Sequence, residues 1–85
     1  MIEKTVLTNL IFNREYFQKV FPYIKSDYFE DANIKKIFDT YSSYVEDYKE
    51  PPSVEALKLS VDKRKDLNED TYKGVMTEFD TMAID

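Results

Sequence analysis

The stretch DANIKKIFDTYSSYVEDYKE, residues 31–50, contains the longest helical pattern in the chain. Its apolar residues recur at steps of three and four, so they line one face of a single helix. That face consists of Ile34, Ile37, Phe38, Tyr41, Val45 and Tyr48, with Tyr44 at its edge. At about 1.5 Å per residue the helix would be roughly 30 Å long, which is the width of a small domain. We expect Pro51-Pro52 to end it, because proline lacks an amide donor and disfavours helical geometry in the residue before it.

Length and composition restrict how the rest of the chain can fold. Its 85 residues allow one small domain, and a domain of this size buries only about 60–65% of its surface. Without cysteine there is no disulfide, so the core must come from large side chains, here six phenylalanines and seven tyrosines. A single glycine argues against a β fold with many tight turns. We therefore predict an all-α fold over residues 1–85, a bundle of five to six helices around the long one.

Toward the N-terminus, periodicity predicts a helix over residues 2–12 and a short helix over residues 14–21. Asn13 can cap the second helix and Pro22 ends it. Residues 23–30 form a connector, with a helical turn starting at its serine. Its apolar side chains should fill the base of the core: Ile24, Tyr28 and Phe29.

Beyond the long helix, Ser53 is a good N-cap for a fourth helix. A charged loop over residues 62–66 leads to a fifth helix capped by Asn68. Apolar residues then repeat at helical spacing to the end of the chain: Tyr72, Val75, Met76, Phe79 and Met82. The pattern is still amphipathic at Asp85, so we expect a longer parent protein. The predicted core consists of Leu7, Leu10, Phe17, Phe29, Ile34, Ile37, Phe38, Tyr41, Val45, Leu57, Val61, Val75 and Phe79.

The chain offers little chemistry for an active site. It contains no histidine, the usual general base near neutral pH, no cysteine nucleophile, and no GxxxxGK[ST] sequence to hold a nucleotide phosphate. Asp66, Asn68 and Asp70 have the spacing that opens a calcium loop, but Thr71 and Thr77 stand where that loop needs glycine and glutamate. We therefore predict no catalytic, cofactor or metal site.

Charge and hydropathy argue against two further classes of partner. The net charge of −5 opposes autonomous binding of nucleic acid, whose affinity comes mostly from Lys and Arg. The short basic clusters at 35–36 and 63–65 are flanked by acids and are assigned to the solvated surface. No apolar run approaches the roughly 20 residues that span a bilayer. An interaction module is the class that remains.

An ordered set of motifs resembles a known family. The stretches EKTVLTNLIFNREYFQKV, SDYF, IKKIF and PPSVEALKLSV follow one another as in the N-terminal domain of DnaB-type hexameric replicative helicases. The likeness covers most of residues 1–76 and is strongest to the T-even-type bacteriophage branch. The matching positions are Glu3, Val6, Leu7, Tyr28-Phe29, Ile37-Phe38, Pro51, Ser53, Leu57 and Val61. These are packing motifs, and their specificity lies in their order.

The resemblance implies a role within a larger assembly. In that family the head precedes a helical hairpin, a linker and a RecA-like ATPase that uses ATP and Mg²⁺ to move along DNA. The heads form a collar that contacts neighbouring subunits, primase and sometimes the loader, in the cytoplasm. The resemblance thus implies a non-catalytic domain of a DNA helicase. The alternative is a free-standing phage regulatory or inhibitor protein with the same helical fold.

Three apolar residues are candidates for contacts with partners because the predicted core does not claim them. Phe12 and Leu59 lie off their own helix faces, and Tyr44 lies at the edge of the long helix's face. Each also has a structural interpretation: Phe12 under the turn at Asn13, Leu59 against the charged loop, and Tyr44 in the core. Because such scattered residues are few, we expect the isolated chain to be a monomer or a weak dimer.

Overall fold

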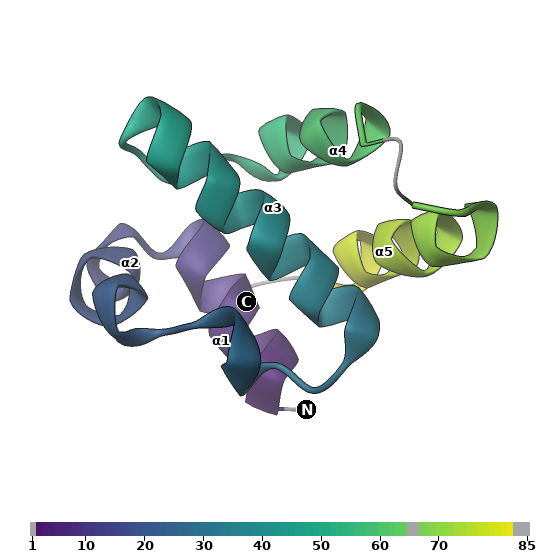
Figure 1. The fold of residues 1–85 in the computed structure, drawn as a ribbon. Helices are drawn as coiled ribbons and strands as arrows, with labels where there is room; N and C mark the ends of the chain where they lie inside the picture. The colour runs from purple at the N-terminus through teal and green to yellow at the C-terminus, as the bar shows by residue number, and fades with distance from the viewer. Residues whose placement is uncertain (1, 65–66, 83–85) are drawn as a thin grey trace.

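The computed structural model describes residues 2–64 and 67–82, and this part of the chain contains helices and no strand (Figure 1). The prediction of an all-α fold is confirmed. The helices are α1 (Ile2–Phe12), α2 (Arg14–Val20), α3 (Ala32–Tyr48), α4 (Val54–Asp62) and α5 (Glu69–Thr81), with two short 3-10 turns, η1 (Phe21–Tyr23) and η2 (Ser26–Tyr28).

Helix α3 crosses the domain, with α2 on one side of it and α4 and α5 on the other (Figure 1). It begins at Asp31, whose carboxylate accepts hydrogen bonds from the backbone N–H of Asn33 (2.9 Å) and Ile34 (3.0 Å). Its other end differs from the prediction, because the helix stops at Tyr48 before the prolines are reached. Lys49 adopts a left-handed backbone (φ 62°) and its N–H donates to the Val45 carbonyl, which terminates the helix.

The shorter helices start where the sequence placed their caps. The side chains of Asn13, Ser53 and Asn68 each accept a hydrogen bond from a backbone N–H three residues later, at 3.1, 3.1 and 2.7 Å. The ends are less accurate, as α2 stops one residue short of the predicted end and α4 includes Asp62, which we assigned to the charged loop. Helix α5 ends at Thr81, and residues 83–85 lie outside the described part of the chain.

The core lies around α3, which contacts α1, α4, α5 and η2. Its buried apolar side chains are Leu7, Leu10, Phe29, Ile34, Ile37, Phe38, Tyr41, Leu57, Val61, Val75, Phe79 and Met82. Phe17 and Val45, which we placed in the core, are only partly buried and pack against its edge. Val45 lies in the last turn of α3, and α2, which carries Phe17, is a short helix without a fully buried residue.

A group of aromatic rings joins α2 and the following turns to α3. Phe21 lies 5.7 Å from Tyr41 and 6.1 Å from Phe38 between ring centroids, and Phe29 lies 4.8 Å from Phe38. The hydroxyl of the fully buried Tyr41 donates to the Leu10 carbonyl at 2.6 Å. This bond satisfies the polar end of a ring that is otherwise surrounded by apolar atoms.

Two tyrosines that we assigned to the interior lie at the surface. Tyr48, in the last turn of α3, and Tyr28, in η2, are each 63% exposed. The buried residues of α3 end at Tyr41, so its last two turns extend beyond the core. In the connector, Phe29 is buried and Ile24 partly buried, which leaves Tyr28 on the solvent side of the short turn.

Polar contacts also link α1 to the elements around it. A carboxylate oxygen of Glu3 accepts from the N–H groups of Glu30 (2.8 Å) and Asp31 (3.2 Å), just before α3 begins. The ammonium group of Lys4 lies 3.2 Å from the Glu78 carboxylate of α5. Glu3 therefore holds the connector against α1, and Lys4 joins the first helix to the last.

Phe38→Ala should lower the free energy of unfolding by about 3–5 kcal/mol, because it empties an aromatic site at the centre of the core. A small domain is stable by only ~5 kcal/mol, so the variant could fail to fold. Urea denaturation followed by circular dichroism measures the change. Tyr23→Ala is the control, since Tyr23 is 74% exposed, and equal midpoints for Phe38→Ala and the parent would contradict the assignment.

Tyr41 should make the domain sensitive to high pH. Burial raises the pKa of its phenol above the ordinary value of about 10, so the unfolded chain ionises first. The neutral phenol therefore makes its full contribution to the free energy of unfolding below about pH 10, and this contribution is lost as the pH rises toward the folded-state pKa. Tyr41→Phe should flatten this decline in urea melts between about pH 9 and 11.5, whereas Tyr23→Phe should keep the decline of the parent.

Candidate functional site

The structure separates the three residues that we proposed for partner contacts. Phe12, at the end of α1, is 48% exposed and lines a hollow of about 380 Å³. The walls of that hollow are Ile11, Phe12, Ser53, Val54, Glu55, Phe79 and Met82. Tyr44 lines a different hollow, and Leu59, 61% exposed on α4, lines neither of these two. The three residues therefore do not line one common hollow among these.

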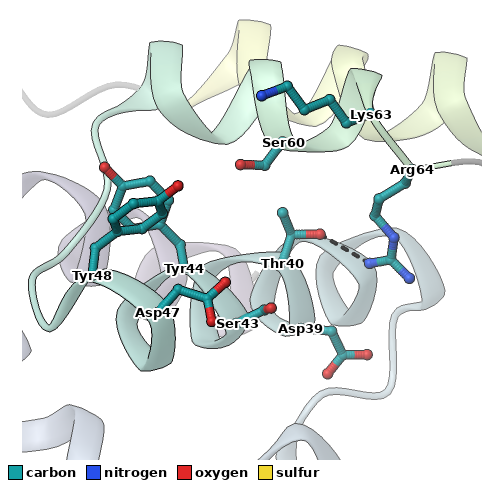
Figure 2. Close-up of a pocket in the computed structure, with 9 residues that line it drawn as sticks. All are labelled: Asp39, Thr40, Ser43, Tyr44, Asp47, Tyr48, Ser60, Lys63 and Arg64. Atoms are coloured by element: carbon teal, nitrogen blue, oxygen red, sulfur yellow. Dashed lines mark hydrogen bonds between the residues drawn. The ribbon is translucent and has the colours of Figure 1, made fainter.

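Tyr44 belongs to a groove of about 410 Å³ between α3 and α4 (Figure 2). Helix α3 contributes Asp39, Thr40, Ser43, Tyr44, Asp47 and Tyr48, and the other wall consists of Ser60, Lys63 and Arg64. The rings of Tyr44 and Tyr48 lie at one end, with centroids 4.4 Å apart and planes inclined by 40°. Sequence analysis proposed Tyr44 as a contact residue but not Tyr48, because the helical period places Tyr48 on the apolar face of the long helix.

A chain of hydrogen bonds holds the other end of the groove. The Arg64 guanidinium donates to the Thr40 hydroxyl at 2.9 Å, and that hydroxyl donates to the Lys36 carbonyl at 2.9 Å. Asp39 accepts from the Ser26 hydroxyl at 2.7 Å. Arg64 thus fixes the end of α4 against α3. It also sets a positive charge at the end of the groove away from the tyrosines (Figure 2).

A third hollow, of about 320 Å³, lies beside the start of α1 and is almost wholly apolar. It is lined by Ile2, Glu3, Val6, Tyr16, Val20, Ile24, Tyr28 and Phe29. Sequence analysis did not identify this hollow, because its residues come from α1, α2 and the connector and meet only through the packing of these elements. The position of Ile2 in the first turn of α1 was the one sign in the sequence that an apolar side chain there would remain partly uncovered.

Within residues 2–64 and 67–82, no three of the side chains that commonly bind metals come together. Asp66, part of the calcium-like spacing, lies outside the described residues. Tyr72 donates to the Asp62 carboxylate, and that hydrogen bond raises the pKa of its phenol. This exposed pair joins α5 to α4.

The same portion of the chain has no helix that is both long enough and apolar enough to cross a membrane. The described helices define the class of this protein as a small all-α domain, with three surface hollows between its elements.

Comparison with known proteins identifies the family. The model of the DnaB-like helicase N terminal domain matches residues 1–83, and the chain belongs to this family. It is similar to a DnaB-like replicative helicase of Enterobacteria phage T4, with 37% identity over 78 residues. The match covers 92% of this chain and 16% of the relative, so the chain spans about one sixth of that helicase. The resemblance inferred from the motifs is confirmed.

We expect the 85-residue chain not to bind single-stranded DNA near physiological salt. Its net charge of −5 repels phosphates, and Arg64, one of two arginines, is bonded to Thr40. Fluorescence anisotropy with a labelled oligonucleotide should show no saturable binding in the roughly micromolar range of non-specific binders. A salt-dependent rise in anisotropy at those concentrations would contradict this expectation.

Proposed function

We propose that this chain is the non-catalytic N-terminal head of a replicative DNA helicase, and that it joins neighbouring subunits and docks primase during DNA replication. The loader is a further proposed partner, and the cytoplasm is the proposed location. The observation that carries the proposal is the family match over residues 1–83.

The structure supports a docking role in two ways. The buried side chains form one core that includes residues from α1, α3, α4 and α5, so the domain can act as a rigid unit. Apolar side chains that this core does not use are exposed on three different helices, among them Phe12 on α1, Tyr48 on α3 and Leu59 on α4. A ring subunit must contact neighbours and an accessory protein at once, and exposed apolar residues on several helices suit that need.

The chemistry of the helicase would lie elsewhere in the protein. This chain lacks the GxxxxGK[ST] sequence that holds a nucleotide phosphate. In the proposal, the ATPase portion of the helicase binds ATP and Mg²⁺. The head sets the arrangement of subunits and the local concentration of primase. Linking primase to the helicase makes its encounters with the exposed strand effectively intramolecular.

Replacing Phe12, Tyr44 and Leu59 together with serine tests the proposal in the helicase that contains this domain. Because the three side chains lie at the surface or its edge, the circular dichroism spectrum should not change. Primase capture or contact between subunits should weaken by about tenfold or more, as expected when interface residues are truncated. Pull-down reports primase binding, and light scattering reports the ring.

Tyr23→Ser is the matched control, since it removes an exposed aromatic ring that lines none of the three hollows described above. It should leave both measurements unchanged. Deletion of residues 1–85 should abolish primase capture. Capture that survives this deletion would contradict the proposed docking role, and capture unchanged by the triple substitution would remove these three residues as contacts.

A further inference from the structure

The pair of tyrosines at the end of α3 has a surface that the fold does not use. Tyr44 and Tyr48 stack on each other one helical turn apart, and Tyr48 remains 63% exposed. Both rings open onto the groove between α3 and α4 (Figure 2). Exposed ring faces carry a negative quadrupole that attracts cations. The two rings therefore form an exposed aromatic surface, called the platform below, that attracts positively charged groups.

Asp47 is the charged residue that α3 contributes near these rings. It lines the same end of the groove as the two tyrosines in Figure 2 and forms no ion pair with the residues that the structure describes. The last turn of α3 has no basic residue, so its carbonyl groups present the negative end of the helix dipole here. Lys49 follows the helix but lines another hollow, with Phe21, Ser42, Val45 and Glu46. A cation is thus favoured at the tyrosine end of the groove.

The two cations that line the groove lie on the α4 side. Arg64 is fixed at the far end by Thr40, and Lys63 lies on the same wall. The Asp39 carboxylate lies at the same end as the Arg64 guanidinium (Figure 2), so that end carries both signs of charge. At the tyrosine end Asp47 would repel a carboxylate, which favours a cation there.

We infer that the groove between α3 and α4 docks a segment of a partner protein, and that an arginine of this segment stacks on Tyr44 and Tyr48 with its guanidinium facing Asp47. A guanidinium suits both features, because its plane stacks on an aromatic ring and its N–H groups bind a carboxylate. The net charge of −5 also favours the approach of a basic segment. The identity of the partner as primase rests on the proposed function; the recognition of arginine does not.

The 85-residue chain tests this inference directly. Titration with the peptide N-acetyl-Gly-Arg-Gly-Arg-Gly-amide, followed by NMR, should shift the Tyr44, Asp47 and Tyr48 resonances in a saturable way. The same peptide with citrulline in place of arginine, which keeps the shape and removes the charge, should not. Tyr48→Ala and Asp47→Asn should each weaken binding roughly two- to five-fold, the range for an exposed cation–π contact. Added salt should weaken it further.

Tyr23→Ala is the control, because it removes another exposed ring and should leave the titration unchanged. Equal affinity in Asp47→Asn, Tyr48→Ala and the parent would overturn the inference, as would equal binding of the citrulline peptide. A second copy is the other occupant to test, since its Arg14 is exposed. Concentration-dependent self-association that Arg14→Gln abolishes would assign the groove to that copy instead.

The corresponding experiment in the helicase separates this inference from the proposed function. If primase capture requires residues 1–85 and falls in Tyr48→Ala and Asp47→Asn, both statements hold. Capture that requires the domain but is unchanged in these variants overturns this groove as the primase site and leaves the proposed function intact. Capture that does not require the domain overturns the proposed function, while the peptide titration still decides the recognition of arginine.

Discussion

The hydrogen bond from the Tyr41 hydroxyl to the Leu10 carbonyl is the interaction on which the packing depends most. A chain of 85 residues without cysteine must build its core from large rings, and a buried tyrosine is tolerated only when its hydroxyl finds an acceptor. Here the acceptor lies on α1, so the bond sets how deeply α3 settles against that helix. The Phe17 and Phe21 rings, 6.1 and 5.7 Å from Tyr41, then place α2 and η1 around the same side chain.

The approach of α5 to α3 at Gly74, the single glycine of the chain, is a second constraint. A methyl group added to Gly74 would lie 2.6 Å from the side-chain amide nitrogen of Asn33, so a larger residue there requires Asn33 to move. Glycine in the middle of a helix costs roughly 0.5–1 kcal/mol relative to alanine. The domain accepts this cost, and Val75, next to Gly74, is fully buried.

Use of the apolar face of α3 by the core determines what is left at the surface. From Ile34 to Tyr41 that face is buried, and beyond Tyr41 the helix continues for two turns without burying another residue. Tyr44 and Tyr48 therefore stack on each other. Helix α4 packs across α3, and Arg64 holds its end there through the hydrogen bond to Thr40. The last two turns of α3 therefore form one wall of a groove, and α4 forms the other. An extension of one helix beyond the core is thus enough to create a groove without altering the fold.

The sequence by itself determined the helices, their N-caps, the family and most of the core. These features depend on local chemistry: Asn13, Ser53 and Asn68 need only backbone N–H groups three residues away, and helical periodicity selects the inner face. Tertiary structure alone decided where that face stops being covered. Periodicity assigned Tyr41 and Tyr48 to the same face, yet one is fully buried and the other is exposed. The groove likewise combines residues far apart in sequence, such as Thr40 and Arg64, which are 24 positions apart, and their meeting depends on how α4 packs against α3.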